Sequence, residues 1–261
     1  MKILILILLF LVVYILFFFQ WKKKNQSFYL KNRPIVFGHR GSPFYITENT
    51  IASFEKALDQ NVDGLELDVR CTKDKKVIIF HDKNLKRLAG KNKNVKSLTL
   101  NEIKKIKLKN GEEIPQLEDI VPLLQKTKVI NIEIKSDWLF SGFDTISKVI
   151  SFIKINNLEK KCIVSSFNPL VLLKIKRISP TVIIGYLYNK KAIFHTWHNL
   201  VWMTRVRPDS LHIHYSLLDS WIVKWSRRQG LKINSYTIND EKVFKKAKID
   251  GVFTDNKEYL K

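Results

Sequence analysis

The sequence predicts an α/β protein built on a closed (β/α)8 TIM barrel, with a small hairpin after strand 2 and one apolar helix ahead of the barrel. Short apolar runs alternate with amphipathic segments from residue 34 to the end of the chain. Without the hairpin strand, parallel strands fall near residues 35, 65, 131, 163, 184, 212, 235 and 252, which favours a closed barrel. The alternative is an open doubly wound sheet, and the lack of a Gly-rich phosphate fingerprint after the first strand disfavours it.

The first segment of the chain predicts a membrane anchor. Residues Ile3–Phe19 are uninterrupted apolar or aromatic side chains, and Trp21 and Lys22–Lys24 follow them. At 1.5 Å per residue, about 17–20 residues just span a hydrocarbon core of about 30 Å. A cleaved signal peptide is the rival interpretation, but it would have small residues at a cleavage site, and Phe17–Trp21 is bulky.

We therefore expect three parts: a transmembrane anchor (1–21), a basic, polar linker (22–33) and the barrel domain (34–261). The protein is expected at the cell membrane as a single-pass protein. The lysines after the anchor favour a cytoplasmic barrel, whereas Lys2 and the amino terminus partly oppose it, so the side of the membrane stays open.

The composition of the chain indicates the charge of its partners and argues against disulfide and zinc sites. The chain has 261 residues, with Lys+Arg 46 against Asp+Glu 24 and a net charge of +22, which favours anionic partners such as lipid, nucleic acid or phosphate-bearing substrates. The basic residues are scattered, so a solvated surface explains much of this excess. Two cysteines, Cys71 and Cys162, exclude a disulfide framework and give no zinc spacing.

Each element of the barrel domain follows from local pattern. Ile51, Phe54 and Leu58 lie at helical spacing in the helix expected at Asn49–Asn61. The connection after strand Gly64–Arg70 is too short for a parallel crossover, so Val77–Phe80 is expected to return as a hairpin. The other expected strands are Pro34–Gly38, Val129–Ile134, Cys162–Ser165, Val182–Leu187, Leu211–His214, Ile233–Thr237 and Gly251–Thr254. The other expected helices are Leu98–Leu108, Gln116–Gln125, Phe143–Asn156, Leu170–Ile178, Lys191–Arg205, Leu217–Gln229 and Glu241–Lys246.

Two acids in strand Gly64–Arg70 point to a metal site. Residues i and i+2 of a strand share a face, so Glu66 and Asp68 lie on one side of the sheet. Two carboxylates about 6–7 Å apart along the backbone repel each other unless a cation lies between them. Carboxylate oxygens suit hard divalent ions such as Mg²⁺ or Ca²⁺. A pair of exposed acids on an edge strand is the alternative interpretation.

Further ionisable residues follow other predicted strands. In a barrel of this kind the active site lies at the carboxyl ends of the strands. His39, Arg40, Glu133 and Lys135 occur there, and His81 ends the hairpin strand. This clustering favours a catalytic site over exposed acids, because the histidines titrate near neutrality and the basic groups suit phosphate oxygens.

Seven short motifs, in order from about Pro34 to Lys261, resemble the glycerophosphodiester phosphodiesterase family. The motifs are Gly38-His39-Arg40-Gly41, Glu48-Asn49-Thr50, Glu66-Leu67-Asp68-Val69, Phe80-His81-Asp82, Ile114-Pro115-Gln116-Leu117-Glu118, Glu133-Ile134-Lys135 and Asp250-Gly251-Val252-Phe253-Thr254-Asp255. The resemblance implies a (β/α)8 barrel, a Ca²⁺ or Mg²⁺ ion, and hydrolysis of glycerophosphodiesters to sn-glycerol 3-phosphate and an alcohol.

The resemblance also implies roles for individual residues. Glu66, Asp68 and Glu133 resemble the metal ligands, His39 and His81 the catalytic pair, Arg40 and Lys135 the phosphate contacts, and Glu48 the supporting acid. Tyr236 stands where many members of the family have Trp, so we expect it to shape the substrate wall. Which histidine acts as acid and which as base stays open.

The sequence is compatible with three functions. The first is the phosphodiesterase with a small glycerophosphodiester substrate. The second is a lysophospholipase D-type hydrolase of lipid phosphodiesters, which the anchor and the basic surface favour. The third is a catalytically inactive, basic membrane-binding module. The net charge and the aromatic segment Phe194–Trp202 favour it. We expect no nucleic-acid partner, because a binding module has no need of metal-type acids at three strand positions.

Overall fold

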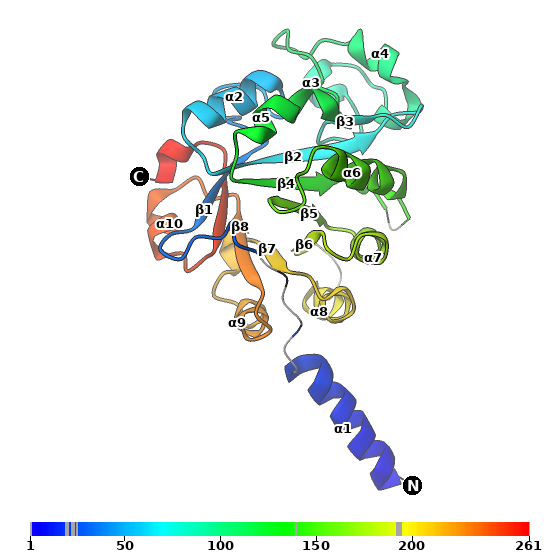
Figure 1. Ribbon diagram of the computed structural model, residues 1–261, viewed down its shortest axis with the longest axis vertical. Coiled ribbons are helices and arrows are strands. Elements are labelled where there is room, and N and C mark those ends of the chain that lie inside the picture. Colours follow the sequence, from blue (N-terminus) through cyan, green and yellow to red (C-terminus); the bar gives the residue numbers. More distant parts are fainter. Residues whose placement is uncertain are drawn as a thin grey trace.

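A closed barrel of parallel strands forms the body of the computed structural model, which describes residues 2–18, 21, 24, 26–138, 140–191 and 195–260 (Figure 1). The first barrel strand pairs with the second and with the last, and these pairings close the barrel as predicted. Its strands are β1 (Ile35–His39), β2 (Gly64–Cys71), β4 (Val129–Ile134), β5 (Cys162–Ser166), β6 (Ile183–Leu187), β7 (Ser210–His214), β8 (Lys232–Tyr236) and β9 (Gly251–Thr254).

Helices surround the barrel, and several are shorter than the sequence pattern indicates. The outer helices are α2 (Ile51–Asp59), α5 (Val121–Gln125), α6 (Phe143–Ile155), α7 (Pro169–Ile178), α8 (His195–Val206), α9 (Trp221–Arg228) and α10 (Glu241–Lys246). The helix expected at Leu98–Leu108 is only α4 (Leu100–Lys104), which a capping box at Thr99 and Glu102 starts. A 3-10 turn occupies the first part of the predicted helix Gln116–Gln125. Residues 192–194 of the predicted helix Lys191–Arg205 lie outside the described part of the chain.

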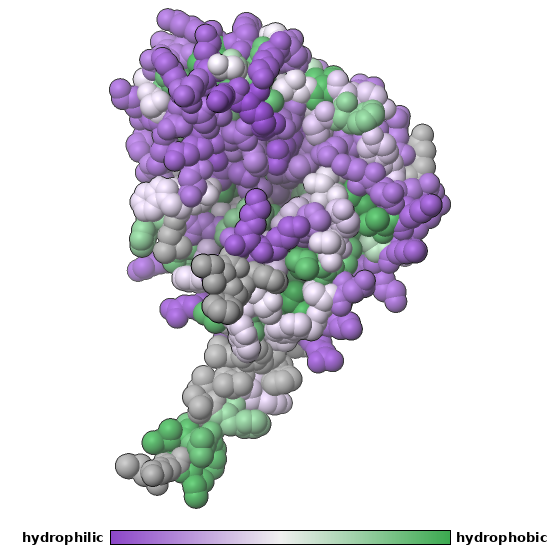
Figure 2. Space-filling model, turned by 180° about the vertical axis from the view of Figure 1, so that it is seen from behind, coloured by the Kyte–Doolittle hydropathy of each residue, from purple (hydrophilic) through white to green (hydrophobic). Residues whose placement is uncertain are grey.

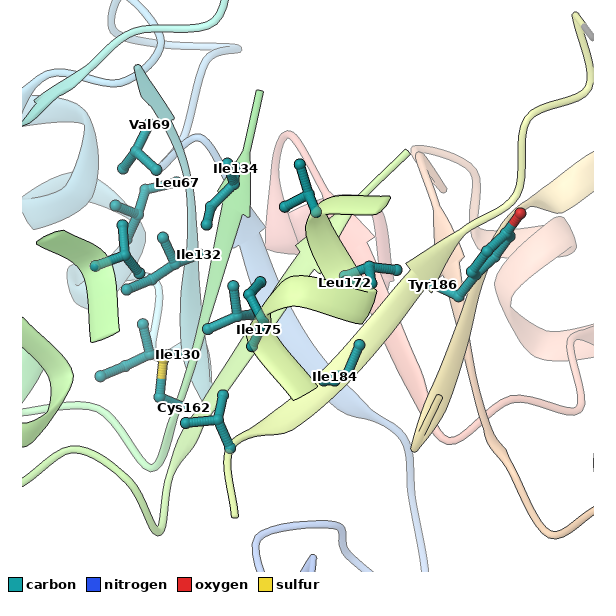
Figure 3. Packing of buried hydrophobic residues seen from close by; sticks show 14 of the residues in the cluster. Leu67, Val69, Ile130, Ile132, Ile134, Cys162, Leu172, Ile175, Ile184 and Tyr186 are labelled. Atoms are coloured by element: carbon teal, nitrogen blue, oxygen red, sulfur yellow. The ribbon is translucent and has the colours of Figure 1, made fainter. Parts of the chain in front are cut away.

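Strand alternation separates the outer core from the barrel interior. Leu67 and Val69 of β2 and Ile132 and Ile134 of β4 belong to the large apolar cluster between strands and helices (Figure 3). Successive side chains of a strand point to opposite faces. The residues between these apolar positions therefore face the barrel interior. A buried strand can thus place acidic side chains inside the barrel while its apolar side chains pack against the helices.

The predicted hairpin is confirmed, and it opens a small subdomain. β3 (Val77–Ile79) runs antiparallel to β2, with Val69 opposite Ile79. The following excursion contains α3 (Lys86–Ala89), which the sequence pattern did not predict, and α4. Its own apolar cluster consists of Ile78, Phe80, Leu85, Val95, Leu98, Ile103, Leu108 and Ile114. This subdomain lies at the top of Figure 1.

The amino-terminal apolar segment forms α1 (Lys2–Phe18), a helix of 17 residues that projects from the barrel (Figure 1). Its described side chains are exposed, with Ile3 at 73% and Phe10 at 71%, and they form an apolar surface in Figure 2. Among the described residues, no helix combines the length and the apolar character required to cross a membrane. Six residues of the predicted anchor and linker lie outside the described residues: Met1, Phe19, Gln20, Lys22, Lys23 and Asn25.

Trp21 of the predicted anchor, and Lys24 and Tyr29 of the predicted linker, pack against the base of the barrel, by which we mean the end where the strands begin. Trp21 is buried, and its ring meets the ring of Trp225 edge-on at 5.5 Å. Lys24 Nζ lies 3.0 Å from Asp209 Oδ2, just before β7. Tyr29 is also buried, and its hydroxyl accepts a hydrogen bond from Asn234 Nδ2 of β8 at 2.6 Å.

Candidate active site

Three buried carboxylates meet at the carboxyl ends of β2 and β4. Asp68 of β2 lies in register with Glu133 of β4, and Glu66 precedes Asp68 by two residues on the same face. One oxygen from each of the three carboxylates lies within 4.8 Å of the others. The structure thus brings together the three acids that the sequence predicted as one group.

Two cations partly neutralise these acids. Lys135 Nζ lies 2.5 Å from Glu133 Oε1 and 3.3 Å from Asp68 Oδ1. Arg40 Nε lies 3.1 Å from Asp68 Oδ2, and the Arg40 backbone N–H donates a hydrogen bond of 2.9 Å to Glu66 Oε2. Both predicted phosphate contacts therefore lie beside the acids.

The protonation of the acids reflects this crowding. Burial, with the neighbouring Asp68 and Glu133 carboxylates, raises the pKa of Glu66 well above its usual range. Burial also acts to raise the pKa of Asp68, but Lys135 and Arg40 outweigh it and hold that pKa far below its usual range. When all three carboxylates are ionised, the two cations leave one negative charge unbalanced, and an all-oxygen donor set suits a hard divalent ion. The residues present therefore fit a divalent metal.

The two predicted catalytic histidines each contact a carboxylate of their own. His39 Nδ1 lies 2.7 Å from Asp255 Oδ1, in the loop after β9. Asn239 Nδ2 donates to the other oxygen of Asp255 at 2.6 Å. A bond of this kind at Nδ1 sets the ring orientation and leaves Nε2 for chemistry.

His81 has an equivalent arrangement with a cation added. Its Nδ1 lies 2.7 Å from Asp82 Oδ1, and Arg87 Nε of α3 donates to Asp82 Oδ2 at 2.6 Å. Arg87 also donates two hydrogen bonds to Glu48, which accepts a third from Arg40. Burial lowers the pKa of His81, and Lys135 and Arg40 act in the same direction.

Asn49 connects the turn before α2 to the metal-type acids. Its side-chain amide donates to Asp68 Oδ2 at 2.9 Å, and its carbonyl oxygen accepts from the Asp68 backbone N–H at 3.2 Å. Asn49 has a positive φ of 59°, a conformation that asparagine tolerates better than most residues. The same turn places Glu48 against Arg40.

Both histidines, the two cations, and Glu66 and Glu133 line one cavity of about 200 Å³. On one wall, the Phe167 and Tyr236 rings meet edge-on at 6.3 Å, and the Tyr236 hydroxyl donates to the Tyr188 carbonyl. The full lining is His39, Arg40, Glu66, His81, Asn131, Glu133, Lys135, Phe167, Leu187, His212, Tyr236, Thr237 and Phe253. The arrangement suits phosphoryl chemistry, because acids for a cation, basic groups and two histidines face a single space.

The model of the "Glycerophosphoryl diester phosphodiesterase family" matches residues 39–258. The chain belongs to this family. A protein named "Glycerophosphodiester phosphodiesterase" from Caldanaerobacter subterraneus subsp. tengcongensis is 36% identical over 240 residues, which cover 87% of this chain and 96% of that protein.

Solved structures agree with this membership. The structure of an Oleispira antarctica phosphodiesterase in complex with the product sn-glycerol-3-phosphate is similar, with a TM-score of 0.77 and 27% identity over 90% of this chain and 96% of that chain. A glycerophosphodiester phosphodiesterase from Thermotoga maritima has a TM-score of 0.72 and 32% identity over 87% of this chain and 96% of that chain.

Within this family fold, every predicted site residue lies at or beside the cavity. Eight of the predicted residues line it or reach it through one side-chain contact: His39, His81, Glu66, Asp68, Glu133, Arg40, Lys135 and Tyr236, with Glu48 behind Arg40. The roles given to these residues stay predictions. Sequence reasoning missed the contacts that Asp255, Asp82 and Arg87 make. The two aspartates stand in motifs that were recognised, whereas no local pattern marks Arg87.

Proposed function

We propose that this enzyme hydrolyses glycerophosphodiesters to sn-glycerol 3-phosphate and an alcohol, with His39 and His81 as its acid–base pair. One observation carries the proposal: a small cavity is lined by two carboxylate-supported histidines and by two members, Glu66 and Glu133, of a cluster of three buried carboxylates. An inactive membrane-binding module is not favoured, because such a module has no need of this set of groups.

Glu66, Asp68 and Glu133 are the residues that would hold the divalent cation, for which we propose Ca²⁺ or Mg²⁺. When bound, the cation supplies positive charge for the phosphodiester and for the negative charge that develops during transfer. Lys135 and Arg40 pair with the same acids, so they lie where a phosphate beside those acids would meet them. We assign both to the phosphate oxygens, because the Lys135 ammonium is a compact positive charge and the Arg40 guanidinium can donate several hydrogen bonds.

The histidines account for the two proton transfers. One imidazole accepts the proton of the attacking oxygen as the new P–O bond forms. The other donates a proton to the departing alcohol oxygen as the old P–O bond breaks. Attack by water gives sn-glycerol 3-phosphate directly, whereas attack by the substrate's own glycerol hydroxyl gives a cyclic phosphate that a water must then open. Asp255 and Asp82 hold the rings for these steps. Tyr236, with Phe167, forms the wall against which the organic part of the substrate packs.

Replacing one catalytic histidine tests this function. We expect His39→Ala to lower kcat on glycerophosphocholine by about 10²–10⁴-fold, as loss of a general acid or base does. His198→Ala on α8 is the control, since His198 does not line the cavity. Assays with Mg²⁺, Ca²⁺ and EDTA identify the ion. Near-normal turnover by His39→Ala would contradict the proposed pair.

We also propose that the apolar segment attaches the enzyme to the cell membrane as a single-pass anchor. At 1.5 Å per residue, the 17 residues of α1 extend about 26 Å, close to the hydrocarbon thickness of about 30 Å. The exposed apolar side chains of α1 support this attachment, because water-exposed aliphatic surface of this kind is costly. Membrane attachment is also what favours the second candidate function, hydrolysis of lysophospholipids.

A further inference from the structure

The base of the barrel carries a groove of about 820 Å³ beside Trp21. Four cations line it: Lys24, Lys160, Lys176 and Arg207. Its two acids are Asp209, which pairs with Lys24, and Glu159. The groove therefore has an excess of positive charge, although no catalytic group lies there.

Exposed residues extend this basic surface. Arg177 lies in the last turn of α7, and Arg227 and Arg228 lie in the last turn of α9. All three are exposed at the base. Two aliphatic side chains at the same end are also exposed, Ile155 at 78% and Ile178 at 44%. A surface of exposed cations and aliphatic groups matches the chemistry of an anionic lipid interface.

The chain path places α1 at this same end. α1 ends at Phe18, and Trp21 is buried against Trp225 at the base. Three residues span at most about 11 Å when fully extended. The helix must therefore leave the molecule close to the base, as Figure 1 shows beyond α8 and α9.

The cavity lies at the other end of the barrel. His39 is the last residue of β1, and Ile35 is its first. Five strand residues cover about 16 Å, and the loops at both ends add to this separation. A phosphate at the bilayer surface beneath the base is thus out of reach of the histidines.

We infer that the base of the barrel rests on an anionic lipid bilayer, so that the cavity opens toward water and takes its substrate from the aqueous phase. This inference rests on the proposed function and on membrane attachment through α1. It selects a water-soluble glycerophosphodiester over a lysophospholipid held in the same bilayer. Trp21 and Lys24 pack on the base, so the chain that follows α1 joins the barrel at this end.

Exposed aromatic residues near the cavity suggest the opposite orientation. Trp138 and Phe140, 61% and 60% exposed, follow β4 at the end where the strands finish. Placing them on the bilayer that holds α1 would require a tether longer than the barrel. The three-residue connection from Phe18 to Trp21 is too short for this.

Fluorescence quenching tests the orientation. The full chain is placed in lipid nanodiscs of phosphatidylcholine and phosphatidylglycerol that contain a spin-labelled lipid. A fluorophore is attached at Lys160→Cys, on the base, or at Lys190→Cys, after β6 at the cavity end; both native cysteines are buried. We expect at least fivefold stronger quenching at position 160 than at position 190. Equal quenching, or stronger quenching at position 190, would overturn the inference.

A paired activity assay tests the consequence for the substrate. The same discs receive soluble glycerophosphocholine, or they contain lysophosphatidylcholine as part of the bilayer. We expect hydrolysis of the soluble diester and at least tenfold slower hydrolysis of the lysolipid. Comparable rates would overturn the inference, whereas inactivity on both substrates, also in detergent, would instead count against the proposed function. The quenching result stands in either case.

Discussion

At the scale of the residue, the two histidines differ in what supports them. Asp255 is held by the neutral amide of Asn239, whereas Asp82 is held by the guanidinium of Arg87. Arg87 also bonds to Glu48, and so it links Asp82 with the acid beside Arg40. Its two acceptors leave the guanidinium few alternative positions. We therefore regard Arg87 as a positioning residue for His81.

Arg87→Ala should lower kcat roughly 10–100-fold with little change in KM, since outer partners of site residues act on this scale. The reason is that Asp82 and Glu48 lose their common donor and His81 loses its orientation. Arg87→Lys should restore part of the activity. Lys86→Ala, one residue earlier on α3, is the control and should behave as wild type in steady-state kinetics. If the Lys86 variant loses as much as the Arg87 variant, Arg87 acts only through the stability of α3.

His212, in the interior of the barrel, predicts a dependence of stability on pH. Burial lowers the pKa of His212 from its usual value near 6.5 to about 3. Between these two pKa values the unfolded chain binds a proton that the folded chain does not, so unfolding becomes easier as the pH falls. The stability is fully present above about pH 6.5 and declines toward pH 3, by at most about 1.4 kcal/mol per pH unit.

Urea unfolding between pH 7.5 and pH 5 measures this effect. His212→Gln should flatten the dependence, because the amide does not titrate. His198→Gln on α8 is the matched control and should keep the wild-type slope. An unchanged slope in His212→Gln would show that other groups cause the acid sensitivity.

At the scale of the element, the start of α2 positions part of the site. Thr50 is the N-cap, and its hydroxyl accepts from the Ser53 backbone N–H and donates to the Thr47 carbonyl. Glu48 and Asn49 lie in the turn just before it. The cap thus determines where a short helix of nine residues begins and where these two site residues lie.

Thr50→Ala should lower the free energy of unfolding by about 1 kcal/mol, and by up to about 2 kcal/mol, through loss of the cap. It should also lower kcat severalfold, because Asn49 and Glu48 are displaced. Thr99→Ala, the cap of α4, should cost similar stability in the same denaturation assay but leave kcat unchanged. If both variants lost the same activity, the α2 cap would have no specific role in positioning the site residues.

At the scale of the whole molecule, barrel closure gathers residues that lie far apart in the chain. His39 and Asp255 are separated by 216 positions and meet because β1 pairs with β9. Glu66 and Glu133 meet because β2 pairs with β4 across the hairpin excursion. A cation bound by these acids would therefore bind the folded chain and not the unfolded one.

Calcium or magnesium should accordingly raise the melting temperature. An ion present at 100 times its Kd stabilises the fold by about 2.7 kcal/mol, or roughly 5–10 °C for a chain of this size. Differential scanning fluorimetry with and without EDTA measures this. Glu66→Gln should shift the response to higher ion concentration, whereas Glu113→Gln, an exposed control, should not. If neither ion changed the melting temperature of the wild-type protein, the assignment of these acids as metal ligands would be contradicted.

The sequence by itself determined the barrel, the hairpin and the shared face of Glu66 and Asp68. These features follow from periodicity and loop length, which are local properties of the chain. The tertiary structure alone decided that Lys135 and Arg40 pair with the acids, that Arg87 bonds to both Glu48 and Asp82, and that Trp21 and Tyr29 pack on the base. The predicted helices at Leu98–Leu108 and Gln116–Gln125 were too long, because helical spacing does not reveal where packing ends a helix. Such contacts join segments that no local pattern relates, and only closure of the barrel brings them within bonding distance.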